Sequence, residues 1–232
     1  MCDICGCGRD DVHTTIELND RLLGVNSGPA RHNREHFISR KLFAINLMGT
    51  PGAGKTALLE ATIRSWRKSS IAVVEGDQAT ERDSARIRRA GAAAFQVETG
   101  LGCHLDANQV HGALHHLELA AGDLVFIENV GNLVCPALFD LGEQLKVVVT
   151  SPAEGVDKPL KYPPMFRAAD IVVLNKCDLL PHVPFEIEQW NEFVMAVNPR
   201  AKILKTSALD GSGMASWIAE IDLRRADFLA EA

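Results

Sequence analysis

The sequence predicts a three-layer α/β fold, in which a mostly parallel sheet of about seven strands carries helices on both faces. Short apolar runs typical of buried strands alternate along the chain with segments of helical character, as they do in parallel sheets. A glycine-rich octapeptide, residues 49–56, joins the first of these strands to the first helix. Acidic or amide residues follow several later strands, and open α/β sheets bind their ligands outside that edge.

Length and composition allow one sizeable core with a short tail. The chain has 232 residues, of which 47% are hydrophobic and 23% are charged. Its formal net charge of −6 argues against nucleic acid or an anionic membrane as a partner, because both require a cationic face. No apolar run approaches the roughly 18 residues of a membrane span, and the first residues lack the apolar core of a secretory signal. We therefore expect a cytoplasmic protein with reduced cysteines.

The first 40 residues differ from the rest of the chain. Residues 1–40 are polar and mixed, and we expect a cysteine-rich metal-binding tail followed by a tether. The run Asn26-Ser27-Gly28-Pro29 is expected to break any helix in this segment. His32 and His36 follow among charged residues, which favours a solvated helix entering the core over a metal site.

Residues 41–232 are expected to form a single nucleotide-binding domain. Its expected strands are residues 42–48, 70–77, 94–98, 123–128, 146–150 and 171–174, with a seventh that ends at residues 205–208. Its expected helices follow the octapeptide from residue 57 and span residues 79–90, 106–121 and 212–230. His111 and His115 share a face of the third helix, and the adjacent His116 suggests that this face is solvated.

The octapeptide reads Gly49-Thr50-Pro51-Gly52-Ala53-Gly54-Lys55-Thr56, the order of a phosphate-binding loop. Its glycines let the backbone bend with several N–H groups turned inward, and the following helix adds a partial positive charge. Lys55 is placed to reach the β and γ phosphates, and the Thr56 hydroxyl to hold a Mg²⁺ ion that bridges them. The loop therefore predicts a nucleoside triphosphate site, in which we include Ala57.

Two acidic strand ends are expected to complete the magnesium site. Asp77 ends the second strand, where it can meet Mg²⁺ or its waters and can also cap the next helix. Glu128 follows four apolar residues, the pattern of a strand whose carboxylate orients the metal shell. Gly131 offers a backbone N–H to the γ phosphate, so residues 131–136 are expected to respond when that phosphate is lost. The expected catalytic residues are Lys55, Thr56, Asp77, Glu128 and Gly131.

The sixth strand leads into a tetrad that selects a base, Asn175-Lys176-Cys177-Asp178. A carboxylate at Asp178 accepts from the guanine N1–H and the exocyclic amine, whereas adenine has no proton on N1. The stem of Lys176 can lie over the purine, and Asn175 can brace neighbouring loops. Two further residues can offer backbone N–H groups to the guanine O6, namely Ser207 and Ala208. The sequence therefore favours GTP over ATP.

Five of the six cysteines fall into two groups that can bind metal. The terminal motif is Cys2-x-x-Cys5-Gly6-Cys7, whose thiolates and the α-amino group can surround one borderline cation such as Ni²⁺ or Zn²⁺. Cys103 and His104 leave one strand and Cys135 leaves its neighbour, so these three can converge on a second site for Ni²⁺ or Zn²⁺. The alternatives are an exposed thiol cluster at the terminus, and buried apolar thiols with a helix-start histidine in the domain.

Together these motifs resemble the HypB family, nickel-loading GTPases of hydrogenase maturation with a P-loop NTPase fold of the SIMIBI class. The resemblance covers nearly the whole chain and includes both cysteine-containing motifs, the phosphate loop, Glu75-Gly76-Asp77, residues 99–107, residues 128–136, Lys158-Pro159-Leu160-Lys161-Tyr162-Pro163 and the base tetrad. It implies hydrolysis of GTP to GDP and phosphate. It also implies a tight nickel site at Cys2, Cys5 and Cys7, and a second site for nickel or zinc at Cys103, His104 and Cys135.

The resemblance further implies the partners of the chain. GTP would favour a homodimer, and nickel would pass, together with a second nickel-maturation accessory protein, to the large subunit of a [NiFe]-hydrogenase. Many members of the family carry a histidine-rich stretch after the cysteine motif, and this sequence lacks one. The resemblance therefore implies delivery of nickel and not its storage.

Three other functions stay open from the residues. Urease-type nickel GTPases share the core but pair their cysteine as Cys-Pro-His, whereas Ala137 follows Cys135-Pro136 here. A small-molecule P-loop kinase would need an acceptor pocket and an arginine-rich lid, and the base tetrad opposes it. A passive metal buffer would bind metal equally well with GTP and with GDP. A metal-delivery GTPase uses every motif, with in-line attack of water on the γ phosphate.

Overall fold

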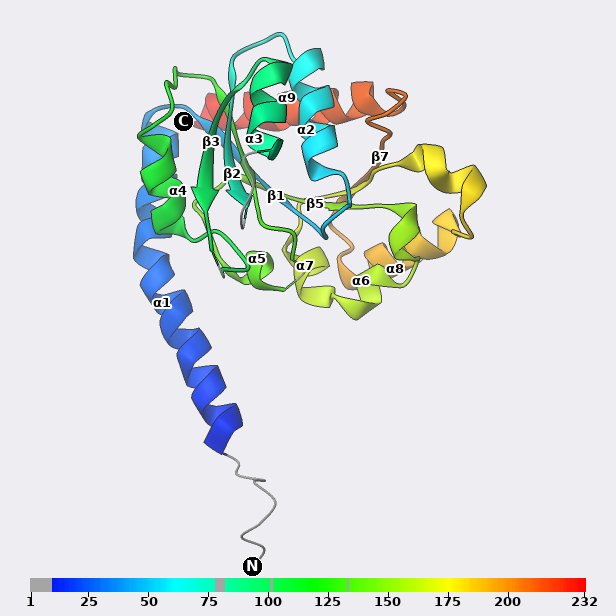
Figure 1. Cartoon of the computed structure of the whole chain (residues 1–232), viewed down its shortest axis with the longest axis horizontal. Coiled ribbons are helices and arrows are strands. Elements are labelled where there is room, and N and C mark those ends of the chain that lie inside the picture. The colour runs from blue at the N-terminus through cyan, green and yellow to red at the C-terminus, as the bar shows by residue number, and fades with distance from the viewer. Residues whose placement is uncertain (1–9, 78–81, 101, 133) are drawn as a thin grey trace, which may run out of the picture.

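The computed structural model describes residues 10–77, 82–100, 102–132 and 134–232. In this part of the chain, seven strands form one sheet in the order β3-β2-β4-β1-β5-β6-β7, and each neighbouring pair is parallel (Figure 1). The strands are β1 Phe43–Met48, β2 Ile71–Asp77, β3 Ala93–Glu98, β4 Leu124–Glu128, β5 Leu145–Thr150, β6 Ile171–Leu174 and β7 Lys202–Lys205. The predicted three-layer α/β fold is confirmed.

Helices connect the strands, because parallel neighbours require crossover connections. The α-helices of the described residues are α1 Asp10–Ser39, α2 Lys55–Ser65, α3 Arg82–Ala90, α4 Ala107–Leu114, α5 Cys135–Leu138, α6 Lys158–Lys161, α7 Pro163–Ala168, α8 Ile187–Val197 and α9 Met214–Glu231. Two 3₁₀-helices, η1 Pro152–Glu154 and η2 Cys177–His182, follow β5 and β6. In the described part of the chain, each helix is too short or too polar to cross a bilayer.

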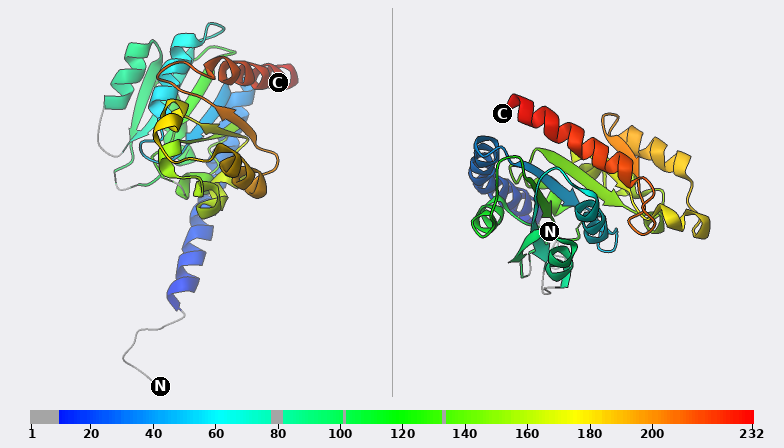
Figure 2. Two further views of the ribbon diagram at one scale, coloured as in Figure 1. Left: turned by 90° about the vertical axis from the view of Figure 1, so that its right-hand side faces the viewer. Right: turned by 90° about the horizontal axis from the view of Figure 1, so that it is seen from above.

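Both faces of the sheet are covered by helices (Figures 1 and 2). On one face, α2, α3 and α9 enclose a core in which Trp217 packs with alternate strand residues such as Ile45. On the other face, Phe37 of α1 and Val110 of α4 pack with Val125 of β4, and α7 and α8 form a separate cluster over β5 and β6. Successive strand side chains point to opposite faces, so the apolar runs supply both cores.

The position of β1 determines where a ligand can bind. β1 lies between β4 and β5, so the chain moves to one side of β1 for β2 to β4 and to the other side for β5 to β7. A crevice forms outside the carboxyl ends of the strands at such a reversal. The phosphate loop, residues 49–56, follows β1 at this point.

Helix α1 runs unbroken through Gly28-Pro29, where we expected a break. Its second half is held against the domain by buried hydrogen bonds. The Asn33 Nδ2 atom donates to the carbonyl oxygens of Ala107 and Leu141 at 2.8 and 3.1 Å, and Ala107 N donates to Asn26 Oδ1 at 2.9 Å. These contacts offset the free-energy cost of the low helix propensity of glycine and of the backbone hydrogen bond that is lost because proline has no N–H. The part of α1 from Asn26 onward thus packs as part of the domain.

The other differences concern helix ends and short helices. The helix expected over residues 106–121 ends at Leu114, and Asp123 accepts from Ala120 N at 2.8 Å in the turn that follows. Helices α5, α6 and α7 contain only four to six residues, which is too short for a 3.6-residue period to be visible. The seven strands agree with the expected ranges to within one or two residues, except that the extent of β7 was left open.

The hydrogen bonds of Asn33 lead to a stability prediction. Asn33→Ala should lower the free energy of unfolding by about 1–3 kcal/mol, because it leaves two buried carbonyl oxygens without their donor. Urea unfolding followed by circular dichroism measures the change. Glu35→Ala, at an exposed position of the same helix, is the matched control and should have little effect. Equal stability of the Asn33 variant and the wild type would show that α1 is not fixed by these bonds.

Candidate functional site

The phosphate loop borders a cavity at the carboxyl ends of β1, β2 and β4. The cavity has a volume of about 570 Å³ and reaches from the loop to the start of the segment that follows β4. Four of the residues expected to be catalytic line it: Lys55, Thr56, Glu128 and Gly131. The fold therefore brings together residues that are widely separated in the sequence.

The loop has a conformation that suits glycine. Gly54 has a φ of 95°, in the left-handed region, and a Cβ there would lie 2.5 Å from Asn175 Nδ2. Lys55 turns back into the loop, with Nζ donating to the carbonyl oxygens of Gly49 and Thr50 at 3.1 and 3.2 Å. Burial lowers the pKa of Lys55, although nearby carboxylates oppose this effect. The loop thus curls around the ammonium group that is expected to meet the phosphates.

A buried carboxylate faces the loop from the end of β4. Glu128 Oε1 accepts a hydrogen bond of 2.8 Å from the Thr56 hydroxyl, while Oε2 is buried and has no hydrogen-bond partner among the described residues. Burial raises the pKa of Glu128 to about 7, against the opposing charge of Lys55 and the bond from Thr56. A buried carboxylate oxygen without a partner beside a threonine hydroxyl is a donor set that fits Mg²⁺.

The end of β2 brings further acidic residues to this edge. Asp77 is the last residue of β2. Glu75 lies opposite Glu128 in the pairing of β2 with β4, is buried, and lines the cavity. The sequence did not single out Glu75 as a site residue. Its position two residues before Asp77 in the sequence was the available signal.

Helix α3 adds a cation that the sequence also did not single out. Arg86 and Asp83 line the cavity, and Arg86 is bonded to Glu60 at 2.8 Å and to Asp83 at 2.9 Å. The bond with Glu60 is the main cause of a raised pKa for Arg86. A guanidinium group is therefore held beside the phosphate loop, in a polar helix whose sequence looks like an ordinary solvated segment.

The segment after β4 is joined directly to the phosphate loop. Gly49 and Asn132 form an isolated antiparallel bridge, and a Cβ on Gly131 would lie 2.8 Å from the backbone nitrogen of Pro51. The side chain of Asn132 continues to Cys135, with 3.9 Å between Nδ2 and Sγ. In this chain of contacts, the single residue Asn132 therefore connects the backbone of the phosphate loop to the Cys135 thiol.

The tetrad after β6 forms a second cavity of about 410 Å³ next to α2. Buried Asn175 donates from Nδ2 to the carbonyl oxygens of Ala53 and Gly54 at 3.3 and 3.2 Å, so it braces the phosphate loop. Lys176 has a φ of 59°, and its Nζ donates to Gly52 O at 2.7 Å. The carboxylate of Asp178 accepts from the Ser207 hydroxyl at 2.6 Å, and Ala208 N points to Asn175 Oδ1 at 3.4 Å. Four of the predicted base-site residues thus line one cavity, namely Asn175, Lys176, Asp178 and Ala208, and Ser207 contacts it through Asp178.

Cys103, His104 and Cys135 come together in one group, which we call the metal cluster because its potential ligand atoms all lie within 4.8 Å of one another. The two sulfur atoms are 2.9 Å apart, and Cys103 Sγ is 3.5 Å from His104 Nδ1. Cys103 and His104 are held next to the end of β4, because Leu105 N donates to Oδ1 of Asn129, the residue after β4, at 3.0 Å. Cys135 begins α5. Two thiols and an imidazole are the donors that Ni²⁺ and Zn²⁺ accept.

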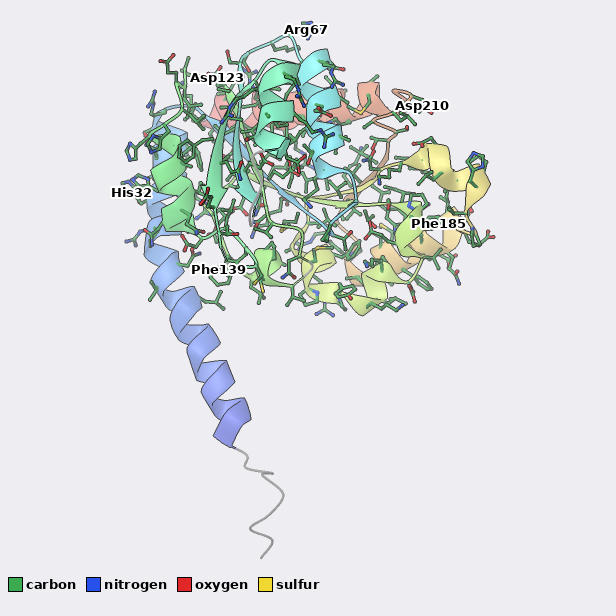
Figure 3. All side chains as sticks on the ribbon, viewed as in Figure 1. His32, Arg67, Asp123, Phe139, Phe185 and Asp210 are labelled. Atoms are coloured by element: carbon green, nitrogen blue, oxygen red, sulfur yellow. The ribbon has the colours of Figure 1, made fainter. Side chains whose placement is uncertain are left out.

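The surroundings of the metal cluster keep Cys135 protonated and His104 neutral when no cation is bound. Burial and the neighbouring Cys103 raise the pKa of Cys135 to about 11. Burial also lowers the pKa of His104, whose ring packs on Phe139, a residue labelled in Figure 3, with 3.8 Å between centroids. A metal would therefore displace a proton from the Cys135 thiol while meeting an imidazole that is already neutral. The predicted terminal ligands lie outside the described residues: Cys2, Cys5 and Cys7.

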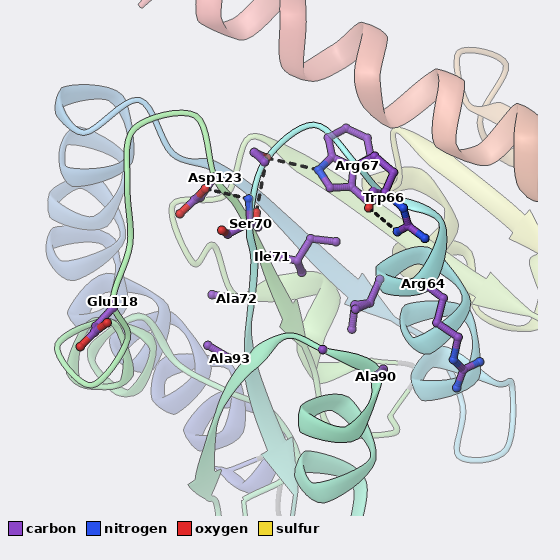
Figure 4. A pocket seen from close by; sticks show the side chains of 13 residues that line it. Arg64, Trp66, Arg67, Ser70, Ile71, Ala72, Ala90, Ala93, Glu118 and Asp123 are labelled. Atoms are coloured by element: carbon purple, nitrogen blue, oxygen red, sulfur yellow. Dashed lines mark hydrogen bonds between the residues drawn. The ribbon is translucent and has the colours of Figure 1, made fainter.

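A larger hollow of about 690 Å³ lies at the opposite end of the strands. Figure 4 shows Ile71 and Ala72 of β2, Ala93 of β3 and Trp66 after α2 around it. Its Asp123 carboxylate already accepts from Ser70 N at 3.0 Å. Because the hollow faces the amino ends of the parallel strands, it is not where an open α/β sheet binds its ligand.

The fold and the site define a P-loop nucleotide-binding protein with a cysteine and histidine cluster beside the phosphate loop. The family described as "CobW/HypB/UreG, nucleotide-binding domain" matches residues 43–205. The chain therefore belongs to the CobW/HypB/UreG family, and within it to the HypB group.

Three similar proteins support the assignment of the chain to the HypB group. The hydrogenase maturation factor HypB of Azotobacter chroococcum mcd 1 is 51% identical over 211 residues, which is 90% of this chain and 69% of that protein. The hydrogenase/urease maturation factor HypB of Helicobacter pylori strain J99 is 38% identical over 199 residues, 84% of this chain and 82% of that protein. The crystal structure of HypB from Helicobacter pylori in complex with nickel superposes with a TM-score of 0.82 and 35% identity, covering 87% of this chain and 95% of that one.

The raised pKa of Glu128 predicts a pH-dependent gain in stability for Glu128→Gln. The folded protein binds this proton more tightly than the unfolded chain, whose glutamate has a pKa of 4.5. The contribution of Glu128 to stability is therefore fully present below pH 4.5 and is lost as the pH rises through about 7. Without Mg²⁺, Glu128→Gln should be more stable than the wild type at about pH 8, by up to about 3 kcal/mol, and similar to it near pH 5.

Urea unfolding in EDTA at these two pH values measures the difference. Glu118→Gln, at an exposed position, is the control and should show no such pH dependence. A constant difference between Glu128→Gln and the wild type across this range would mean that Glu128 ionises normally in the folded protein.

Proposed function

We propose that the chain is a GTPase that binds nickel and delivers it during maturation of the active site of [NiFe]-hydrogenases. The observation that carries the proposal is the link from the phosphate loop to the metal cluster, through the Gly49 and Asn132 bridge and the contact of Asn132 with Cys135. Names of similar proteins support it, because they are called hydrogenase maturation factors and one solved relative contains nickel. Nucleotide state and metal geometry would then change together.

In the proposed reaction, water attacks the γ phosphate of GTP in line, and GDP and phosphate leave. Lys55 exchanges its two loop carbonyls for the β and γ phosphate oxygens, and Gly131 donates its N–H to the γ phosphate. Thr56, Glu128 and Asp77 would hold Mg²⁺, for which the buried Oε2 of Glu128 is a ready acceptor. Bound Mg²⁺ supplies charge neutralisation at the phosphate oxygens.

Guanine is the base that suits the second cavity. Among the described residues, the Ser207 hydroxyl is the close hydrogen-bond donor to the Asp178 carboxylate, at 2.6 Å, and Asp178 lines the cavity where a base edge would lie. An exchange of that hydroxyl for two donors of guanine would satisfy the carboxylate, whereas adenine offers only one donor on this edge. Ser207 and Ala208 would then turn their backbone N–H groups to the guanine O6, and Lys176 would cover the ring.

We propose that two chains complete the metal cluster. Cys103, His104 and Cys135 supply three ligands, and a tetrahedral or square-planar ion needs a fourth. Val134 and Leu138, on either side of Cys135, are 46% and 48% exposed and would be covered in a homodimer. Since Gly131 and Asn132 also contact the phosphate loop, GTP would favour the dimer by the same linkage.

The remaining assignments of the proposal concern the tail and the partners. Residues 1–40 would carry a separate nickel site at Cys2, Cys5 and Cys7, and residues 41–232 would be the GTPase domain, against which α1 packs from Asn26 onward. The partners would be a second nickel-maturation accessory protein and the hydrogenase large subunit, all in the cytoplasm. Zn²⁺ is proposed as the other metal that the metal cluster takes.

Urease maturation is a second candidate for the recipient, because the similar Helicobacter pylori protein is named a hydrogenase/urease maturation factor. Pull-down with each nickel-free apoenzyme, followed by nickel transfer from the loaded protein, distinguishes the two recipients. Transfer to the hydrogenase large subunit alone is the expected result.

Asp178→Asn should move base preference away from guanine. The amide cannot accept from both guanine donors, but it can pair with xanthine, so affinity for GTP should fall at least about tenfold while xanthosine triphosphate gains. Equilibrium dialysis with GTP, ATP and xanthosine triphosphate measures the three affinities. Asp210→Asn, at an exposed loop position nearby, is the control. A variant that kept its preference for GTP would contradict the assignment of the base site.

Cys135→Ser should weaken metal binding and remove its dependence on nucleotide. Cys135 is the ligand that the contact through Asn132 ties to the phosphate loop, so its loss should leave affinity for Ni²⁺ equal in the GDP and GTP-analogue forms. Competition with a chromophoric chelator, in chains whose Cys2, Cys5 and Cys7 are serine, measures the affinity. Cys177→Ser removes a thiol outside the metal cluster and should leave metal affinity unchanged. If Cys135→Ser retained the wild-type difference between nucleotides, the proposed coupling would be wrong.

A further inference from the structure

Four imidazoles meet on the outer surface where α1 packs against α4. They are His32 and His36 of α1 and His111 and His115 of α4, and we call them the histidine cluster. The ring centroids of His32 and His111 are 4.8 Å apart, those of His111 and His115 are 4.7 Å apart, and those of His36 and His111 are 6.4 Å apart. Figure 3 labels His32 at the place where α1 passes α4. We expected two unrelated solvated faces from the sequence, and the structure joins them.

The meeting of the two pairs follows from the packing of the helices. Each pair is four residues apart on its helix, so its members share one face, one turn above the other. The Asn33 bonds to Ala107 and Leu141, together with the buried ring of Phe37, hold α1 against α4 at this level. The histidines border this buried contact but stay reachable from solvent, since His32 and His115 are exposed.

The geometry of the α4 pair suits a metal ion. The Nε2 atoms of His111 and His115 lie 3.2 Å apart and face each other. An ion placed at a usual metal–nitrogen distance of about 2.0–2.1 Å from both would have a nitrogen–metal–nitrogen angle of about 100°, which is close to tetrahedral. A hydrogen bond between the two rings would also explain the distance. The rings of His32 and His36 lie beside this pair, and although their nitrogens do not converge with it in this conformation, rotation of either side chain would bring a third donor to the ion.

The charges around the cluster favour neutral imidazoles, the form that binds metal. Burial is the first cause of a lowered pKa for both His36 and His111. Arg40 then lowers the pKa of His36 further, and the other histidines of the cluster act on both rings. Nδ1 of His111 is buried and has no hydrogen-bond partner among the described residues, so the contact of its Nε2 with His115 is the one that depends on its tautomer. Both rings are thus free to present a lone pair.

We propose that the histidine cluster is a further metal site, which binds one divalent late transition metal, Ni²⁺ or Zn²⁺, through His111 and His115 with His32 or His36 as a third ligand. Imidazole nitrogen is a preferred donor for these ions. The site needs no thiol, and it does not rest on the proposed GTPase function.

The histidine cluster and the metal cluster lie near opposite ends of one short helix. His104 precedes α4, His115 follows it, and α4 contains 8 residues, a length of about 12 Å. One rigid element therefore carries a thiol-rich site at its start and an imidazole-only site at its end. The second site would accept a metal under oxidising conditions that inactivate thiols.

Equilibrium dialysis of the full chain against Ni²⁺ alone tests the proposal. Serine in place of Cys2, Cys5, Cys7, Cys103 and Cys135 removes the competing ligands. This background should still bind one equivalent of Ni²⁺, and His111→Gln with His115→Gln should weaken that binding at least about tenfold. His116→Gln is the matched control on the same surface, since its ring stacks on Phe95 with 4.3 Å between centroids and lies outside the cluster.

A second measurement covers the case in which the serine background does not fold. In the wild-type chain, Ni²⁺ should protect His111 and His115 from modification by diethyl pyrocarbonate, read by peptide mass spectrometry, while exposed His182 stays reactive. Unchanged reactivity of His111 and His115 with saturating Ni²⁺ would overturn the proposal. So would binding in the serine background that His111→Gln with His115→Gln leaves intact. Either result would mean that the histidine cluster is held by hydrogen bonds and does not bind metal.

Discussion

The hydrogen bond from the Thr56 hydroxyl to the Glu128 carboxylate ties the start of α2 to the end of β4, and the rest of the site depends on it. It closes the phosphate loop against the strand from which Gly131 and Asn132 continue. It also holds a buried carboxylate whose second oxygen lacks a partner among the described residues. That arrangement costs free energy in the free protein, since a buried acceptor is left unsatisfied, and a bound cation would relieve the cost.

Two chains of contacts start from the phosphate loop. Towards β6, Asn175 binds the loop carbonyls of Ala53 and Gly54, so the base cavity and the phosphate cavity share one wall. Towards β4, Asn132 joins the loop to Cys135. The other half of the metal cluster is fixed separately, through Leu105 and Asn129. If Asn132 moved relative to Asn129, the distance between the thiols of Cys135 and Cys103 would change.

Much of the fold and of the site could be predicted from the sequence, because both depend on local sequence patterns. Apolar runs identify buried strands, and the phosphate loop and the base tetrad have fixed spacings at strand ends. The continuity of α1 through Gly28 and Pro29 could not be predicted. Hydrogen bonds from Asn33 to residues more than 70 positions away stabilise the helix there. The meeting of His32 with His111 depends on the same packing. Glu75 was overlooked because its importance lies in its register with Glu128.

The continuity of α1 also has a consequence for whatever the chain carries before it. The part of the helix from Asp10 to the anchored Asn26 would be about 24 Å long, and it projects from the domain in Figures 1 and 2. Such a helix acts as a semi-rigid spacer and not as a random coil. A group carried at the far end of this helix has an effective concentration at each site on the domain. The direction of the helix then determines that concentration more than the number of residues between the group and the site does.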